Sequence, residues 1–223
     1  MEKMFATLSA DVVDSTSLST EDTIKLKGSL EGFFPIMKSL CDEAWGRVVR
    51  GDSMECVIPE AQKSLRIALL LKCYVKSLDL SSASNMMKKK GMRVVIGLGS
   101  LRINDEHNGI IDGEAIYSSG RELDKLSGND VISLMMVSGK LNENGYAALC
   151  DVLGFVMDQA TSKQCAVLQH LLLGQTQTQV AKCLGLEQPT VNQHANAAGW
   201  NAIQRALAKF ESENFNFLKG TDT

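Results

Sequence analysis

The chain of 223 residues has few aromatic residues (5%), three prolines and three histidines. It has no apolar run approaching the ~20 residues that a membrane-spanning helix needs. Its opening residues, MEKMFATLSADVV, lack the basic region and apolar core of a secretory signal. We therefore expect a cytoplasmic protein with no membrane partner.

The sequence also lacks a large excess of either charge, since the formal net charge is −3. No basic tail is present, because residues 151–223 hold five Lys or Arg against six Asp or Glu. None of the six cysteines forms a CxxC pair, and no Cys/His cluster has the spacing of zinc ligands. We expect buried, reduced thiols and no zinc site.

The hydrophobic pattern over the first 140 residues alternates between strands and helices. The expected strands cover 5–13, 46–50, 54–58, 91–101 and 131–137, and the expected helices cover 21–45, a segment from 59 onward, and 112–127. This order predicts an α+β fold, a sandwich of the ferredoxin-like kind with helices packed on a sheet.

No strand is expected after Gly139, where the sequence becomes helical. The expected organisation is an α+β domain at 1–140, a connecting helix at 141–160, and a small all-α domain at 161–223.

Two aspartates stand where the first strand ends, in the stretch SADVVDST (9–16), and Asp52 follows Gly51 on the turn of the expected hairpin. If the two strands are neighbours, Asp11 and Asp52 face each other, and a shared cation such as Mg²⁺ relieves their repulsion. The alternative is structural: Asp14 caps the following helix and Asp52 stabilises the turn. The residues alone leave both readings open.

The most specific local pattern is TQTQVAKCLGLEQPTVNQH (176–194), which is typical of a helix-turn-helix. Small Ala181 lets two helices cross closely, Gly185 permits the turn, and Val191 anchors the second helix. The pattern is similar to modules in sigma factors and response regulators.

Helical geometry turns an amide-rich face of the second helix outward, and Asn and Gln can bind adenine through two hydrogen bonds in the major groove. The expected DNA-binding residues are Gln188, Thr190, Asn192, Gln193 and Asn196. Residues 161–223 hold only five Lys or Arg, so one copy is expected to bind DNA weakly and a dimer more strongly. A helical module that docks on protein is the alternative.

The stretch ADVVDSTSLS, the Gly51-Asp52 hairpin, IGLGSL (96–101) and DGEAIYSSGRELDKL (112–126) together resemble the class III nucleotide cyclase homology domain. The resemblance spans about residues 4–138. It implies metal binding by Asp11 and Asp52, phosphate binding by Arg121, a site formed across a homodimer, and a nucleotide as candidate ligand. The purine-reading positions fall on apolar Val48 and Ile110, which puts purine selection and cyclisation in doubt.

The whole chain resembles the SatD-like family of bacterial proteins, which join such a domain to a C-terminal helix-turn-helix. The motif DGxAxYxxxxxLD carries this resemblance together with the tail, and it includes Tyr117. The resemblance implies architecture more than activity.

Three functions compete at this stage: a DNA-binding transcriptional regulator with a degenerate cyclase-like sensor or dimerisation domain, a metal-dependent nucleotide-binding or phosphoryl-transfer enzyme, and an adaptor. We favour the regulator over the enzyme, and the catalytic residues and cofactor are unassigned apart from the candidate Mg²⁺.

Overall fold

The computed structural model describes residues 3–126, 132–138, 145–213 and 215. The strands are β1 (Phe5–Val12), β2 (Trp45–Arg50), β3 (Ser53–Ile58), β4 (Met92–Gly99), β5 (Ile103–Asp105), β6 (Ile110–Asp112) and β7 (Leu134–Ser138). The α-helices are α1 (Thr20–Leu40), α2 (Ser64–Ser77), α3 (Asn85–Lys90), α4 (Glu114–Leu126), α5 (Tyr146–Gln159), α6 (Ser162–Leu172), α7 (Gln177–Leu184), α8 (Gln188–Ala197) and α9 (Trp200–Glu211). Two short 3₁₀ turns, η1 (Ser15–Ser17) and η2 (Ala61–Lys63), complete the described elements.

Five strands form the main sheet in the order β2-β3-β1-β4-β7, and β5 pairs with β6 in a separate hairpin. All neighbours in the main sheet are antiparallel except β4 and β7, which are parallel. The mixed α+β class expected from the sequence is therefore confirmed.

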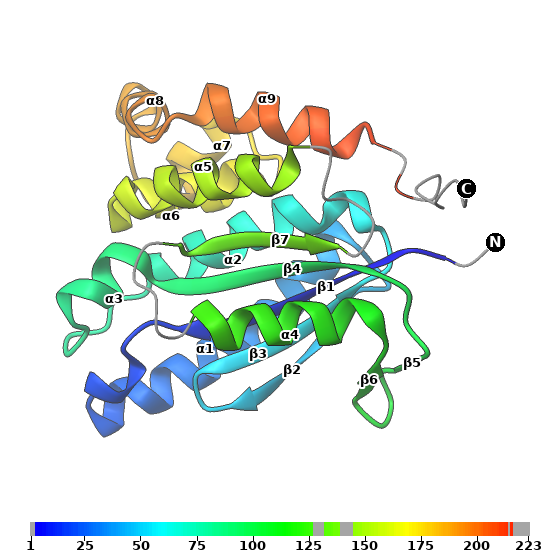
Figure 1. Cartoon of the computed structure of the whole chain (residues 1–223). Coiled ribbons are helices and arrows are strands. Elements are labelled where there is room, and N and C mark those ends of the chain that lie inside the picture. The colour runs from blue at the N-terminus through cyan, green and yellow to red at the C-terminus, as the bar shows by residue number, and fades with distance from the viewer. Residues whose placement is uncertain (1–2, 127–131, 139–144, 214, 216–223) are drawn as a thin grey trace.

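The two faces of the sheet are packed differently, because side chains on β1 alternate between them. Ala6, Leu8 and Ala10 are fully buried in the large core with α1 and α2. On the opposite face the hydroxyls of Thr7 and Ser9 contact Ser119 of α4, at 3.1 and 2.8 Å. Helix α4 crosses this second face in front of the sheet (Figure 1), so polar β1 residues lie beneath it.

Several expected boundaries are wrong in detail. Helix α1 ends at Leu40, and Trp45, expected in the helix, begins β2 and donates a hydrogen bond from its indole to Asn104 at 2.7 Å. Asp14 makes no cap for α1: Ser19 caps it, while Asp14 precedes η1 with φ 56°. The β5–β6 hairpin was not expected. The starts of the strand expected at 131 and of the helix expected at 141 lie outside the described residues.

The helices after β7 share one continuous hydrophobic core with the sheet. Helix α6 packs along α2, and α5 packs on β7. Arg66 of α2 donates to both carboxylate oxygens of Glu211 on α9, at 2.5 and 2.9 Å, and to the carbonyl of Leu172 at 3.1 Å. The helical region therefore lies directly against the sheet layer (Figure 1), and the division at 140 and 160 stays a prediction. Within the described part of the chain, no helix combines the length and apolarity required to traverse a bilayer.

A buried polar cluster, which we call the Lys72 junction, lies where α2, the start of β7 and the end of α5 meet. The Lys72 ammonium is buried, donates to the Met92 carbonyl at 2.6 Å, and lies 3.4 Å from the Asp158 carboxylate. Asp158 also accepts a hydrogen bond from Ser133 at 2.7 Å. Burial lowers the pKa of Lys72 to about 8, although the charge of Asp158 opposes this shift.

Candidate functional site

Asp11 and Asp52 lie together at one rim of the sheet, as the sequence analysis expected. Asp11 is paired in register with Ser53, and the next amide, Val12, donates to the Asp52 carbonyl at 2.9 Å. Both aspartates line a cleft of about 350 Å³ between the β2–β3 hairpin and α4. Arg50, Glu55 and Asp124 contribute further charged groups to its walls.

The Asp11 carboxylate is already engaged by a cation of the chain itself. Arg93 stands opposite Asp11 in the register of β1 and β4, and its guanidinium donates to both carboxylate oxygens, at 2.9 and 2.7 Å. A third guanidinium nitrogen donates to the Leu126 carbonyl at 3.1 Å, which holds the fork in place. Such a two-point pair is the strongest common arrangement for a carboxylate and an arginine.

Burial nevertheless raises the pKa of Asp11 above its ordinary value. Arg93 opposes that rise through its hydrogen bonds and its charge, whereas the negative charge of Asp52 adds to it. The charge of Asp52 is thus felt at Asp11, but Arg93 outweighs it, and burial is the main cause of the net rise in the pKa of Asp11.

These residues do not form a ready metal site. Asp52 accepts a hydrogen bond from the Ser15 hydroxyl, and both oxygens of Asp11 are taken by Arg93. Within residues 3–126, 132–138, 145–213 and 215, no three His, Cys, Asp or Glu side chains are grouped so that they could hold an ion. A divalent ion prefers several oxygen ligands, so Asp11 would have to leave Arg93 first. Metal binding by Asp11 and Asp52 therefore stays a prediction.

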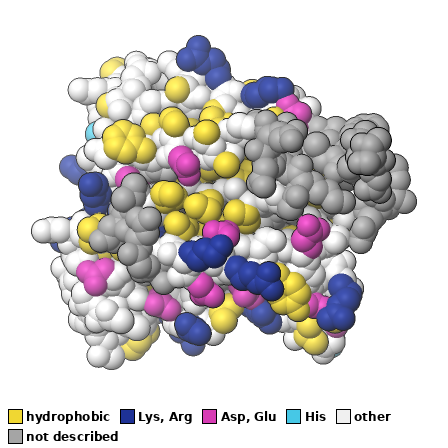
Figure 2. Space-filling model, in the orientation of Figure 1, with side chains coloured by type: hydrophobic (Ala, Val, Ile, Leu, Met, Phe, Trp, Pro, Cys, Tyr) yellow, Lys and Arg dark blue, Asp and Glu magenta, His cyan; other side chains and the backbone are white. Residues whose placement is uncertain are grey.

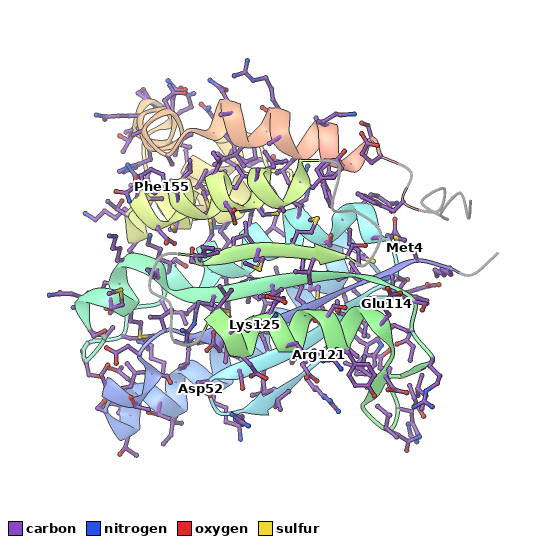
Figure 3. The ribbon with its side chains drawn as sticks, in the orientation of Figure 1. Met4, Asp52, Glu114, Arg121, Lys125 and Phe155 are labelled. Atoms are coloured by element: carbon purple, nitrogen blue, oxygen red, sulfur yellow. The ribbon has the colours of Figure 1, made fainter. Side chains whose placement is uncertain are left out.

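Arg121, the expected phosphate ligand, is exposed on α4 and does not line this cleft. The α4 residues that do line it are Gly120, Leu123 and Asp124. Figure 3 labels Asp52 on the hairpin and Arg121 on α4, and Arg121 is not among the residues that line the cleft with Asp52. Its role in binding phosphate stays a prediction.

Arg93 was missed by the sequence analysis. It stands within the apolar run MRVVIGLG of β4, and a single charge near the start of a buried strand was the available signal. Tyr117, noted in the family motif, donates from its hydroxyl to Asp112, which also pairs with Arg102. Both hydrogen bonds lower the pKa of Asp112, and the hydrogen bond from Tyr117 has the larger effect. The cluster closes the loop before α4.

A second candidate site is the pair α7 and α8. Thr176 and Gln179 form a reciprocal capping box at the start of α7. The helix ends at Gly185, whose φ of 64° suits glycine, and the Leu186 amide then donates to the Ala181 carbonyl at 2.9 Å. Val191 is fully buried and fixes α8 against the remaining helices.

The outward face of α8 carries amide side chains. Gln188, Asn192, Gln193 and Asn196 are exposed, and Thr190 is half-buried. Gln177 of α7 joins them, because its side chain accepts from Gln188 at 2.9 Å and donates to Asn192 at 3.3 Å. We call this set the amide face; its members are Gln177, Gln188, Thr190, Asn192, Gln193 and Asn196.

The amide face is not covered by the sheet layer. Helix α8 packs on α6, α7 and α9, and in Figure 1 it lies at the outer corner of the helical layer, on the far side of that layer from the hairpin. Helix α8 itself has no Lys or Arg. The nearest basic residue before it in the sequence is Lys182, which is exposed on α7. This face thus offers hydrogen-bonding groups with little positive charge.

Comparisons of the chain with family models, with curated proteins and with solved structures find no match. The functional argument therefore depends on the geometry of the two sites.

Proposed function

We propose that this protein is a DNA-binding transcriptional regulator in which α8 reads the major groove and the sheet layer acts as a sensor or dimerisation domain. The single observation that carries the proposal is the exposed amide face on a helix that follows a tight, glycine-ended turn. A helix-turn-helix presents its second helix to base edges in this way.

The chemistry of the amide face favours nucleic acid over an apolar partner. Asn and Gln side chains supply both a donor and an acceptor, which matches adenine in the major groove, and a good pair contributes about 1–3 kcal/mol of discrimination. Gln177 links Gln188 and Asn192, so these side chains are partly ordered before DNA arrives. A docking surface for protein would expose apolar anchors instead.

The sheet layer supports the sensor part of the proposal. The order β1-α1-β2-β3-α2-β4, with the short helix α3 added before β4 and the strands arranged β2-β3-β1-β4, favours a ferredoxin-like, cyclase-homology domain. Arg93 occupies the carboxylate that such a domain would need for metal. This arrangement favours a degenerate site over an active one.

The direct test is fluorescence anisotropy of a labelled random-sequence duplex titrated with the protein at about 50 mM salt. We expect binding that weakens as salt rises, because each phosphate contact releases counterions. Asn192→Asp and Gln193→Glu place negative charge on the amide face and should abolish it. Gln204→Glu adds the same charge on an exposed position of α9 and serves as the matched control. Absence of salt-sensitive binding, or equal loss in the Gln204→Glu variant, would count against the proposal.

A metal-dependent nucleotide-binding or phosphoryl-transfer enzyme is the second candidate, favoured by one observation: two aspartates meet in a 350 Å³ cleft. It predicts nucleoside triphosphate turnover that requires Mg²⁺ or Mn²⁺ and disappears in Asp11→Ala. Inactivity with all four nucleoside triphosphates and both ions would remove this candidate.

A further inference from the structure

Helix α2 carries a second buried lysine, one turn after Lys72. Lys76 is 7% exposed, and its ammonium donates to the main-chain carbonyls of Met157 and Asp158, at 2.7 and 2.9 Å. An ammonium has three N–H donors, so one donor of Lys76 has no partner among the described residues. Carbonyl groups are neutral, so they leave the buried charge of Lys76 unbalanced.

The Lys72 junction does not supply the missing negative charge. Its carboxylate, on Asp158, lies 3.4 Å from the Lys72 ammonium and accepts the hydrogen bond of Ser133. Lys72 and Lys76 are neighbours on one face of α2, and the charge of Lys76 lowers the pKa of Lys72 after burial has lowered it more. Two ammonium groups therefore share one carboxylate in a buried region, which leaves one positive charge without a counter-ion.

Two buried thiols also lie beside the lysines. Cys73 of α2 and Cys165 of α6 hydrogen-bond to each other, which raises the pKa of Cys73 and lowers that of Cys165. Burial raises the pKa of both thiols, whereas the charges of Lys72 and Lys76 lower it. A thiolate at Cys165 is therefore the alternative counter-ion for Lys76, and its absorbance distinguishes the two cases.

A pocket of about 240 Å³ adjoins Lys76, between the end of α2, helix α3 and the start of α6. We call it the Lys76 pocket. Its apolar walls are formed by Val75, Leu78, Leu80, Ala83 and Met87. Figure 1 shows α3 and the turn from α5 to α6 at the same end of the molecule, on the left, and Figure 2 shows Lys or Arg side chains at that end.

The Lys76 pocket suits a small anion with an apolar body. Lys76 and Lys88 line it against one acid, Asp79. Ser162 brings the positive N-terminal end of α6 to the same space. The apolar walls solvate a dianion poorly, so a monoanion fits better. A volume of 240 Å³ equals about eight water molecules at about 30 Å³ each, which is too small for a nucleotide.

We propose that the Lys76 pocket binds a small organic monocarboxylate, whose carboxylate pairs with the Lys76 ammonium and whose body contacts the apolar walls. Such a ligand supplies both the missing negative charge and the third hydrogen-bond partner. Among the described residues, none lines both this pocket and the cleft of Asp11 and Asp52. The ligand contacts the sheet layer and α6, on which α8 packs. Its binding does not require that α8 bind DNA.

The experiment measures the binding of hexanoate, benzoate and hexan-1-ol to the full chain by isothermal titration calorimetry, without DNA. Hexan-1-ol has the length of hexanoate and no charge. We expect at least one of the two carboxylates to bind with a Kd of about 0.1–1 mM, as suits ligands of this size. Hexan-1-ol should bind at least about 10-fold more weakly than hexanoate. Amide NMR shifts caused by the carboxylate should cluster at residues 75–88 and at Ser162.

Three variants separate the charge from the cavity. Lys76→Met keeps the length of the side chain and removes its charge, so carboxylate binding should weaken by at least about 10-fold while hexan-1-ol binding persists. Lys89→Met removes an exposed charge of α3 that does not line the pocket, and it should bind like the wild type. Ala83→Phe fills the pocket from a half-buried position and should abolish binding of every probe, which keeps the test available if Lys76→Met does not fold.

Three results would overturn the proposal. The first is no binding of either carboxylate at about 10 mM, and the second is equal affinity for hexanoate and hexan-1-ol. The third is a thiolate absorbance near about 240 nm in the wild type at pH 7 that Cys165→Ser removes, because Cys165 would then already balance Lys76. Since DNA is absent, each of these results leaves the proposed DNA binding untouched.

Discussion

Replacing Lys72 with Met gives a pH-dependent stability difference whose sign and size follow from the structure. Burial depresses the pKa of Lys72 from 10.5 to about 8. Below pH 8 the ammonium is charged in both states, and the folded state bears the full cost of burying it. Between about pH 8 and 10.5 the folded protein releases this proton while the unfolded chain keeps it, so the wild type gains stability relative to a variant without the amine.

The magnitude follows from the size of the pKa change. The fall from 10.5 to about 8 corresponds to about 3 kcal/mol, at about 1.4 kcal/mol for each tenfold change in proton affinity. Methionine has a similar volume and avoids a large cavity. At pH 7 the variant also loses the hydrogen bond to the Met92 carbonyl, 2.6 Å away, and leaves Asp158 with one cation fewer. The attraction to Asp158 is also lost from the wild type once Lys72 releases its proton, and it is already contained in the pKa of Lys72, so the pH dependence reports on that pKa.

The assay is urea denaturation of both proteins at pH 7, 8, 9 and 10, with the free energy of unfolding compared at each pH. Titrating groups far from the junction cancel in the difference between the two proteins, whereas Lys76 and Cys73 interact with the charge of Lys72 and contribute to it. We expect the wild type to gain on the variant by about 2–3 kcal/mol over this range. A difference constant to within about 0.5 kcal/mol would show that Lys72 is not held in a desolvated site, and the account of the junction would fail.

Three further predictions concern the cleft and the turn. Arg93→Met leaves Asp11 without its cation and should raise the pKa of Asp11 further. The free energy of unfolding should fall by about 1–3 kcal/mol at pH 7, and by less at pH 5, because the carboxyl gains its proton more readily there. Urea titrations at both pH values measure this difference. Gly185→Ala should cost about 1 kcal/mol by thermal melting, because φ is 64° and no atom within 4 Å obstructs the methyl group. Gly28 lies in the middle of α1 on its exposed side and is equally unobstructed, so Gly28→Ala should instead stabilise the protein by about 0.5–1 kcal/mol. Equal effects of the two alanines would contradict the assignment of Gly185 to a left-handed turn.

The sequence predicted element types well where hydrophobic periodicity was strong. The alternation in β1 and the continuous apolar run of β4 correctly indicated buried strands. The end of α1 was misplaced because residues 41–45 continue a helix-like apolar spacing, and only tertiary contacts, such as that of Trp45 with Asn104, place that residue in a strand. Local pattern carries no information about such a partner 59 residues away.

The candidate site was predictable only in part, for the same reason. Asp52 lies on the turn between β2 and β3, and β3 pairs antiparallel with β1, so the start of β3 lies beside the end of β1 and Asp11 and Asp52 share one rim. The Arg93 pair depends on the register between β1 and β4, which no local motif encodes because Asp11 and Arg93 are 82 positions apart in the sequence. That register decides whether Asp11 is available to a metal ion.

The most direct test of the central claim is selection of binding sites from a pool of random-sequence duplex DNA, followed by affinity measurement on the selected sequence. If the amide face of α8 reads bases, the wild type should enrich a defined motif and bind it at least about 10³-fold more tightly than unselected DNA. Gln193→Ala should relax the preference at one or two base pairs. Recovery of a motif that Asn192→Asp and Gln193→Glu enrich equally well, or of no motif at all, would contradict the account.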